Sequence, residues 1–312
     1  MRDAVIKAVE ELARNDKDVI LISGDLGFGV LDNFRREMPK QYFNAGVCEQ
    51  NMASIAAGLA LEGKKVYTYS IGNFPTLRCI EQIRNDICYH NANVTIMAVG
   101  GGFAYGSLGM SHHATEDIAI MRSLPNMRVF TPADAAEANL VAYQAAKLSA
   151  PCYIRLNKGG EPNIHSSYEA VEGYGLGQAI PLRDGADVCL LSAGAITIEA
   201  MKAAQVLETQ KVEAAVYSFP SVKPIDAEAL IMCAERYKYI FTVEEHNIIG
   251  GFGSAVSEII AEKGTRAKVV RIGLPDIYSS IVGSQAYLRH VYQMDSQAIA
   301  EKVLETINSD KN

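Results

Sequence analysis

The chain has 312 residues, of which 49% are hydrophobic and 21% charged, and this ordinary globular composition supplies apolar material for about two domains with buried cores. Its 29 Lys and Arg residues are outnumbered by 36 Asp and Glu residues, which gives a formal net charge of -7. Because nucleic-acid binding needs a clustered positive surface, a mildly acidic chain without a basic block is not expected to bind nucleic acid.

The cysteines and the apolar segments indicate the compartment. The N-terminus has the pattern of an amphipathic helix without the apolar core of a signal peptide, and no run reaches the ~18 apolar residues of a membrane span, so no membrane association is expected. We expect buried free thiols rather than disulfides or a zinc site, because no C-x-x-C pair occurs and most cysteines stand inside apolar runs. These features predict a cytoplasmic protein. The six cysteines are Cys48, Cys79, Cys88, Cys152, Cys189 and Cys233.

Strands and helices alternate along the first half of the chain. Val19–Ile22 is a continuous apolar run, as expected of a strand buried on both faces. Alternation of this kind predicts parallel strands with helices on both faces of a sheet. The patterns predict, in order, an N-terminal helix, a strand at 19–22, a helix at about 50–61, a strand at 65–69, a helix with an apolar stripe at Leu77, Ile80, Ile83 and Ile87, strands at 94–99, 128–130 and 152–156, and a helix after 130 with Thr131 as its cap and Pro132 just inside.

A change of composition separates this half from the rest. Residues 161–185 are rich in glycine and loop-forming residues, and we expect a linker with room for one short strand. The alternation then restarts. The sequence therefore predicts an α/β protein with two doubly wound domains, one at 1–160 and a smaller one at 186–312. The second domain is expected to contain strands at 187–192, 212–218, 239–244 and 267–272, and helices at 195–209, 226–236, 252–263 and about 295–308.

Ligands of open parallel sheets bind beyond the carboxyl ends of the strands, so the segments after the strands are candidates for a site. Glu49 stands at the start of a predicted helix, where a glutamate is either an ordinary first-turn acid or a catalytic carboxylate. Phe74 follows the next strand, and it is either part of the core or a flat surface on which a heteroaromatic ring can stack.

Two glycine-rich segments follow later strands. The first, at 100–117, contains His112 and His113, which as sequence neighbours cannot both face one metal ion from a regular element. A single histidine acting near neutral pH in a polar site fits this loop better. The second, at 250–254, matches neither the dinucleotide nor the P-loop pattern, and it favours a tight turn before a helix over a nucleotide site.

Taken in order, these segments resemble the transketolase family over nearly the whole chain. The resemblance implies a thiamine diphosphate pyrimidine-binding domain followed by a smaller domain of the transketolase C-terminal type. The segments that carry it are Ile22–Leu26, Asn44–Ala57, Asn73–Phe74 with Glu81–Arg84, Gly109–His113 with Glu116–Asp117, and Glu244–His246 with Gly250–Val256.

The resemblance also implies residues that bind the cofactor. Glu49 would hydrogen-bond the ring nitrogen of the cofactor's aminopyrimidine, favour its imino tautomer and thereby activate the cofactor. Phe74 would stack on the same ring. Asp25 and Leu26 would line the same pocket.

On the substrate side, the resemblance implies that His112 faces the substrate carbonyl and that Arg155 meets a substrate phosphate, to which a guanidinium is well suited. The chain departs from the family at two places. Leu108 stands where sugar-phosphate transketolases have an aspartate that contacts acceptor hydroxyls, and Gly100–Gly102 stand where a histidine is expected. Because leucine accepts no hydrogen bond, we expect a modified, deoxy or nucleotide-linked sugar as acceptor in place of ordinary pentose phosphates.

The family binds the cofactor's diphosphate through Mg²⁺ in a separate domain with a Gly-Asp-Gly motif, and this chain has no such motif. Its one Gly-Asp pair is Gly24–Asp25, followed by Leu26. The resemblance therefore implies a companion subunit that binds the diphosphate and Mg²⁺, no metal site on this chain, an α2β2 assembly, and no activity of this chain alone. The reaction implied is transfer of a two-carbon ketol unit from a ketose or ketose phosphate to an aldose-type acceptor.

Three alternatives share the fold. The first is the β subunit of a 2-oxo acid dehydrogenase decarboxylase component, which has the same architecture and uses a glutamate in the same way. The second is the synthase that condenses pyruvate with glyceraldehyde phosphate, which is normally one long chain. The third is a non-catalytic interaction module.

Overall fold

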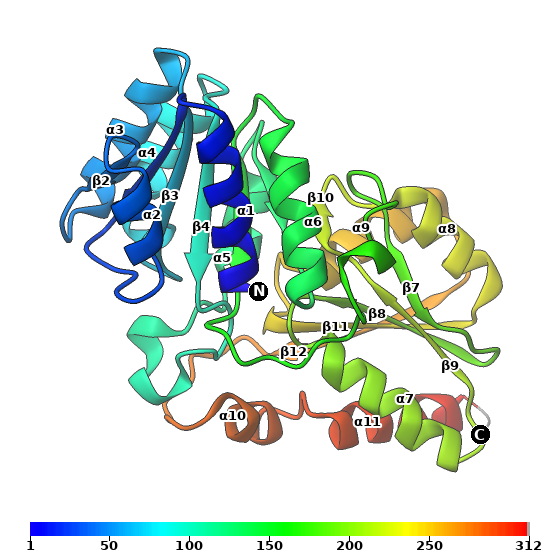
Figure 1. Ribbon diagram of the computed structural model, residues 1–312. Coiled ribbons are helices and arrows are strands. Elements are labelled where there is room, and N and C mark those ends of the chain that lie inside the picture. The colour runs from blue at the N-terminus through cyan, green and yellow to red at the C-terminus, as the bar shows by residue number, and fades with distance from the viewer. Residues whose placement is uncertain (311–312) are drawn as a thin grey trace.

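The computed structural model describes residues 1–310, and it contains two α/β domains, each built on its own sheet (Figure 1). The first sheet has seven strands in the order β10-β5-β6-β4-β3-β1-β2, and the second has five in the order β12-β11-β8-β9-β7. The strands are β1 (Val19–Ser23), β2 (Tyr42–Asn44), β3 (Lys65–Ile71), β4 (Val94–Val99), β5 (Arg128–Phe130), β6 (Cys152–Leu156), β7 (Ile180–Arg183), β8 (Val188–Ala193), β9 (Ala214–Ser218), β10 (Ser221–Lys223), β11 (Tyr239–Asn247) and β12 (Lys268–Leu274).

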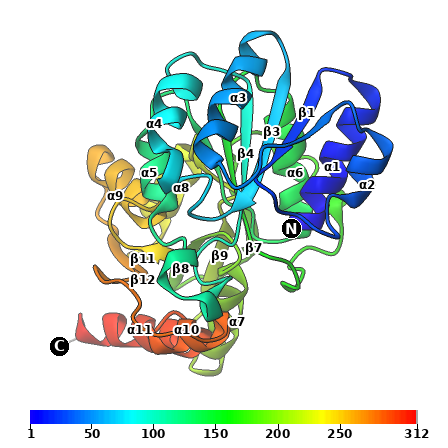
Figure 2. The same ribbon diagram turned by 90° about the vertical axis from the view of Figure 1, so that its left-hand side faces the viewer.

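Helices cover both faces of the first sheet, as its fully buried strands require. Every residue of β1, β4 and β6 is buried, which leaves no face of these strands for water. Helices α1 and α6 pack side by side on one face (Figure 1), and α3, α4 and α5 lie on the other (Figure 2). The helices of this domain are α1 (Arg2–Asn15), α2 (Asp32–Glu37), α3 (Glu49–Leu61), α4 (Ile80–Gln82), α5 (Asp117–Ser123) and α6 (Ala135–Ala146).

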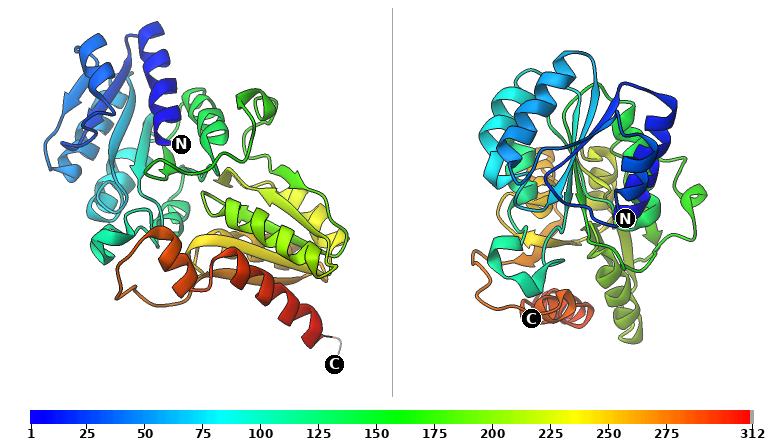
Figure 3. Two further views of the ribbon diagram at one scale, coloured as in Figure 1. Left: turned by 60° about the horizontal axis from the view of Figure 1, so that its bottom comes forward. Right: turned by 60° about the vertical axis from the view of Figure 1, so that its left-hand side comes forward.

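The second domain repeats the layered arrangement with a smaller sheet. Its strands are parallel except β7, which pairs antiparallel with β9 and lies within the predicted linker. Helices α7 and α11 pack together on one face, where Figure 3 shows them in yellow-green and red, and α8 and α9 pack on the other. The helices are α7 (Thr197–Thr209), α8 (Ala227–Arg236), α9 (Phe252–Lys263), α10 (Gln285–Val291) and α11 (Ser296–Ser309).

The two domains are joined by more than the chain connection. Strand β10 comes from the second half of the chain and pairs antiparallel with β5 of the first sheet. The Nζ atom of Lys223 at its end donates hydrogen bonds to the carbonyl oxygens of Arg122 and Leu124. One apolar core also contains residues of α3 and β4 together with residues of α8 and α9. The carboxyl edge of the first sheet is therefore held against the second domain.

Two predicted helices differ in detail from the structure. Helix α6 begins at Ala135, and its cap is Asp134, whose side chain accepts hydrogen bonds from the backbone N–H groups of Ala136 and Glu137, so Thr131 does not cap it. The stripe from Leu77 is not one regular helix, because a 3₁₀ turn at Leu77–Cys79 leads through α4 into a π-helical turn at Ile83–Cys88. Irregular turns of this kind often accompany functional sites.

Two further expectations concern the thiols and the membrane. All six cysteines are free, and five of them are buried as predicted, whereas Cys48 is exposed. Within residues 1–310, none of the helices combines the length and the apolar character needed to cross a bilayer.

Candidate active site

Glu49 is the first residue of α3, and its carboxylate is almost fully withdrawn from water. Its exposed fraction is 1%, and Oε2 accepts a hydrogen bond of 2.7 Å from Nη1 of Arg78. Gly24 at the end of β1 lies beside it, because a Cβ built there would stand 3.7 Å from Cγ of Glu49 and 3.5 Å from Oγ of Ser70, which are ordinary contact distances. That Oγ is buried without a hydrogen-bond partner. A buried carboxylate thus lies beside an unused polar atom at the carboxyl edge of the sheet.

Phe74 lies in a tight turn directly after β3. Its N–H donates to the carbonyl oxygen of Ile71 over 2.8 Å, and Oγ1 of Thr76 donates to the carbonyl oxygen of Gly72 over 2.9 Å. The guanidinium carbon of Arg78 stands 4.4 Å from the centre of the Phe74 ring, so the same guanidinium contacts both Phe74 and Glu49. This carboxylate and this aromatic face are therefore arranged around one planar group that donates hydrogen bonds.

His112 approaches Phe74 from the glycine-rich loop after β4. The two ring centres are 5.2 Å apart, with an angle of 71° between the planes. Burial, and after it the neighbouring His113, lower the pKa of His112 below its ordinary value, so the ring is neutral at neutral pH. His113 is buried, and its Nε2 lies 3.1 Å from the carbonyl oxygen of Gly106. Of the two histidines, His112 contacts Phe74, while His113 holds the loop.

Asp25 and Leu26 lie at the same carboxyl edge, at the end of β1. Asp25 has a positive φ of 58°, and its side chain accepts a hydrogen bond of 2.8 Å from Asn44, whose oxygen in turn accepts from the backbone N–H of Asp25. Asp25 is exposed and Leu26 is half-buried. Both residues therefore flank the region of Glu49.

The second domain fixes the glycine-rich loop through Glu245 of β11. Its Oε1 accepts a hydrogen bond of 2.6 Å from the backbone N–H of Phe103, and its Oε2 accepts one of 2.6 Å from Nε of Arg289. Glu245 and Arg289 are both buried. The loop after β4 lies between the first sheet and α10 (Figure 1). The sequence pattern contained Glu245 only as part of a family motif and gave no sign of this contact.

Arg155 lies in β6, as predicted, and its side chain is engaged within the protein. Its side chain is buried, Nε donates to Oδ2 of Asp117 over 2.8 Å, and Nη2 donates to the carbonyl oxygens of Ala114 and Glu245. Asp117 also accepts a hydrogen bond from the hydroxyl of Tyr153. This guanidinium already neutralises a buried carboxylate and binds two carbonyls, and its contact with a substrate phosphate stays a prediction.

Lys158 is the exposed cation at the same strand end, three residues further along. Its Nζ lies 5.9 Å from the centre of the Tyr105 ring, which in turn lies 6.4 Å from the centre of the His112 ring. Phe74, His112, Tyr105 and Lys158 thus form a continuous row that begins beside the buried Glu49. Sequence reasoning missed Lys158, because Arg155 at the end of β6 is another cation only three residues before it.

A cavity of about 360 Å³ opens next to this row. Asn73, Leu77, Met110 and His113 are among the residues that line it, and it therefore borders both the Phe74 turn and the histidine loop. The Oδ1 atom of Asn73 and the Nδ1 atom of His113 are buried without hydrogen-bond partners. No group of three or more potential metal ligands occurs among residues 1–310.

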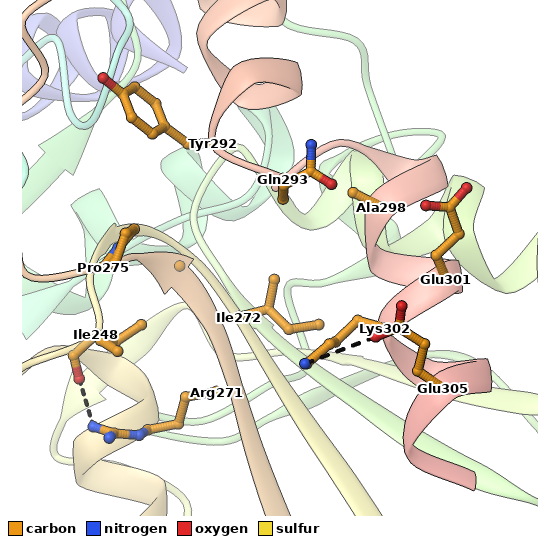
Figure 4. A pocket seen from close by; sticks show the side chains of 11 residues that line it. Ile248, Arg271, Ile272, Pro275, Tyr292, Gln293, Ala298, Glu301, Lys302 and Glu305 are labelled. Atoms are coloured by element: carbon orange, nitrogen blue, oxygen red, sulfur yellow. Dashed lines mark hydrogen bonds and ion pairs between the residues drawn. The ribbon is translucent and has the colours of Figure 1, made fainter. Parts of the chain in front are cut away.

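A second hollow, of about 330 Å³, lies on the second domain between β12 and α11 (Figure 4). Its two cations are engaged within the protein: Nη1 of Arg271 donates to the carbonyl oxygen of Ile248 over 2.6 Å, and Nζ of Lys302 lies 3.9 Å from Oε2 of Glu305. None of the residues in the row from Glu49 to Lys158 lines it. This hollow is therefore separate from the candidate active site.

Comparisons with known proteins account for both halves of the chain. Residues 1–161 match the family described as transketolase, pyrimidine binding domain, and residues 177–299 match that described as transketolase, C-terminal domain. The chain is 35% identical to a subunit of the apulose-4-phosphate transketolase of Phocaeicola vulgatus, over 95% of this chain and 94% of that protein. It is 32% identical to the 6-deoxy-6-sulfo-D-fructose transketolase subunit SqwH of Clostridium sp., over 96% of this chain and 92% of that protein.

A solved structure agrees with these relatives. It is a split-gene transketolase described as an inactive β4 tetramer, and it superposes with a TM-score of 0.86 at 35% identity, covering 97% of this chain and 96% of that one. Both domains and their arrangement are therefore shared with a subunit of the same extent.

Proposed function

The chain belongs to the transketolase family as the β-type subunit of a split enzyme, and from this premise we propose that its Glu49–Phe74 site binds the pyrimidine end of thiamine diphosphate for ketol transfer. The observation that carries the proposal is the pairing of a buried carboxylate with an aromatic face around one planar hydrogen-bond donor. An aminopyrimidine ring offers the same features, so the residues present fit the cofactor.

Glu49 would hold the ring nitrogen of the pyrimidine, and Phe74 would support the face of that ring. Bound thiamine diphosphate supplies the nucleophilic carbon that cleaves the bond beside a ketose carbonyl. The 1% exposure of Glu49 strengthens its hydrogen bond, because water does not compete for the carboxylate. His112, neutral at neutral pH, can donate a proton to a substrate oxygen or accept one from it. Asp25 and Leu26 would border the ring at the end of β1.

A companion subunit would supply the diphosphate and Mg²⁺ site. The chain has no Gly-Asp-Gly motif, and residues 1–310 contain no cluster of metal ligands. We therefore propose an α2β2 enzyme in which the cofactor lies between the two kinds of subunit. The relative that is described as an inactive β4 tetramer supports dependence on a partner. Six free cysteines support a cytoplasmic location.

The substrate would be an anionic, modified sugar. The row from Phe74 through His112 and Tyr105 ends at Lys158, which would bind a terminal phosphate or sulfonate in place of Arg155. Leu108 is 52% exposed and offers no hydrogen-bond acceptor to sugar hydroxyls. The two relatives named for apulose 4-phosphate and 6-deoxy-6-sulfofructose support an acceptor or donor of this class. Activity with xylulose 5-phosphate and ribose 5-phosphate at ordinary transketolase rates would contradict it.

The test is reconstitution with the companion subunit in the presence of thiamine diphosphate and Mg²⁺. We expect ketose consumption that needs both chains and falls by about 100-fold or more in Glu49→Ala, because the loss of a positioned proton-transfer group costs that much. Glu258→Ala, which removes an exposed carboxylate from the second domain, is the matched control and should retain activity. Turnover on 2-oxo acids instead of sugars would favour the decarboxylase alternative. A complex without turnover on either class would favour the interaction module.

A further inference from the structure

Arg78 makes both of the contacts that the proposed function assigns to the cofactor's pyrimidine ring. Its Nη1 donates to Oε2 of Glu49 over 2.7 Å, and its guanidinium carbon lies 4.4 Å from the centre of the Phe74 ring. Because two planar groups cannot stack on the same face of one phenyl ring, a pyrimidine that takes this face of Phe74 has to displace the guanidinium of Arg78 from it. We propose that Arg78 is an internal stand-in for the pyrimidine, which competes with the cofactor for Glu49 and Phe74 and turns out toward solvent when the cofactor binds.

The chemistry of the two groups supports this competition. A guanidinium is flat, stacks on aromatic faces and donates several N–H bonds in one plane, as an aminopyrimidine does. Without a partner, a carboxylate as buried as that of Glu49 would be an uncompensated charge, which is strongly destabilising. Arg78 therefore keeps the site formed until the ring takes its place.

The position of Arg78 permits the exchange. Its side chain is 45% exposed, whereas that of Glu49 is 1% exposed, so the guanidinium can reach water without crossing a packed core. It stands in the 3₁₀ turn at Leu77–Cys79, directly after the Phe74 turn. Arg84 follows on the same irregular helical segment, but it is exposed and donates to Asn85, so it has no part in the site. Arg84 is thus a matched control.

The first test is titration of thiamine diphosphate, with Mg²⁺ present, into the cofactor-free complex of this chain with its companion subunit, followed by calorimetry. Arg78→Met keeps an apolar stem beside Phe74 and removes the competing donor. We expect it to lower the Kd for the cofactor about 10-fold, which corresponds to about 1.4 kcal/mol. Arg78→Lys, which keeps the charge without the planar fork, should lie between Arg78→Met and the wild type. Arg84→Met should match the wild type.

The second test is thermal melting of the subunit without cofactor. Arg78→Met should lower its Tm, because Glu49 loses its partner, and adding Glu49→Gln to that variant should restore most of the loss. An unchanged or weaker cofactor affinity in Arg78→Met would overturn the proposal and make Arg78 an ordinary cofactor or structural contact. Failure of the proposed function would look different, since wild type and Arg84→Met would then also bind no thiamine diphosphate.

Discussion

Glu245→Gln is the substitution that tests how the second domain supports the active site. Glu245 is 3% exposed and holds the backbone N–H of Phe103 and the guanidinium of Arg289 with hydrogen bonds of 2.6 Å each. Breaking a buried ion pair by removing one charge costs about 3–5 kcal/mol. A glutamine keeps the shape and one acceptor oxygen, and Glu199 lies 3.8 Å from Nη1 of Arg289 as a second carboxylate. We therefore expect a loss of about 3 kcal/mol, at the low end of that range.

The assay is urea unfolding of the subunit at pH 7, followed by the near-ultraviolet circular dichroism of its tyrosines, since the chain has 15 tyrosines and no tryptophan. Glu258→Gln is the control, because Glu258 also crosses the domain interface, to Arg122, but its side chain is 55% exposed. An exposed pair of this kind should cost less than about 1 kcal/mol. In the reconstituted enzyme, Glu245→Gln should also reduce turnover, because the loop that carries His112 loses its anchor at Phe103.

Equal, small losses in both variants would refute this reasoning. They would mean that the carboxylate of Glu245 contributes no more than a surface charge and that the loop is held by its own packing. A loss of stability without any change in turnover would keep the energetic argument and refute the link to His112.

Two further predictions concern charged groups. Lys158→Ala should raise KM for a phosphorylated or sulfonated sugar about 10-fold, the equivalent of about 1.4 kcal/mol of lost binding, with little change in kcat. The KM for a neutral sugar donor should be unaffected, and Lys158→Arg should bind the charged sugar normally. Equal effects on charged and neutral sugars in steady-state kinetics would contradict the assignment. Burial raises the pKa of Glu244 from 4.5 to about 7, so the folded state binds a proton at this carboxyl more tightly than the unfolded state does. The stability that results is fully present below pH 4.5 and is lost as the pH rises through 7. Burial also lowers the pKa of His246 from 6.5 to about 4, so the stability contributed by the neutral imidazole is present above pH 6.5 and is lost as the pH falls through 4. The contributions of His246 and Glu244 therefore change with pH in opposite directions. In Glu244→Gln only the His246 effect remains, so its Tm should fall with acidification between pH 6.5 and 4.5 more steeply than the Tm of the wild type. Parallel Tm curves would contradict the raised pKa of Glu244.

Local sequence determined the type of most of the predicted strands and helices, and it indicated the sheet edge at which the candidate site lies. The apolar run at Val19–Ile22 is the strand β1, and the helix predicted at about 50–61 is α3. These features are local, because a strand buried on both faces needs an uninterrupted apolar run, and a helix that packs on one side has apolar residues every three to four positions. The segment around Glu49 therefore pointed to the carboxyl edge of the first sheet before any fold was known.

Only the tertiary structure decided which charged groups are free to act. Arg155 lies in β6 and Lys158 follows it, but the guanidinium of Arg155 is bound by Asp117, 38 residues away, and by the carbonyl oxygen of Glu245, 90 residues away. Arg78 likewise meets Glu49 across 29 residues. A charge is available to a ligand only when no partner in the fold has taken it, and such partners come from distant segments that no local pattern brings together.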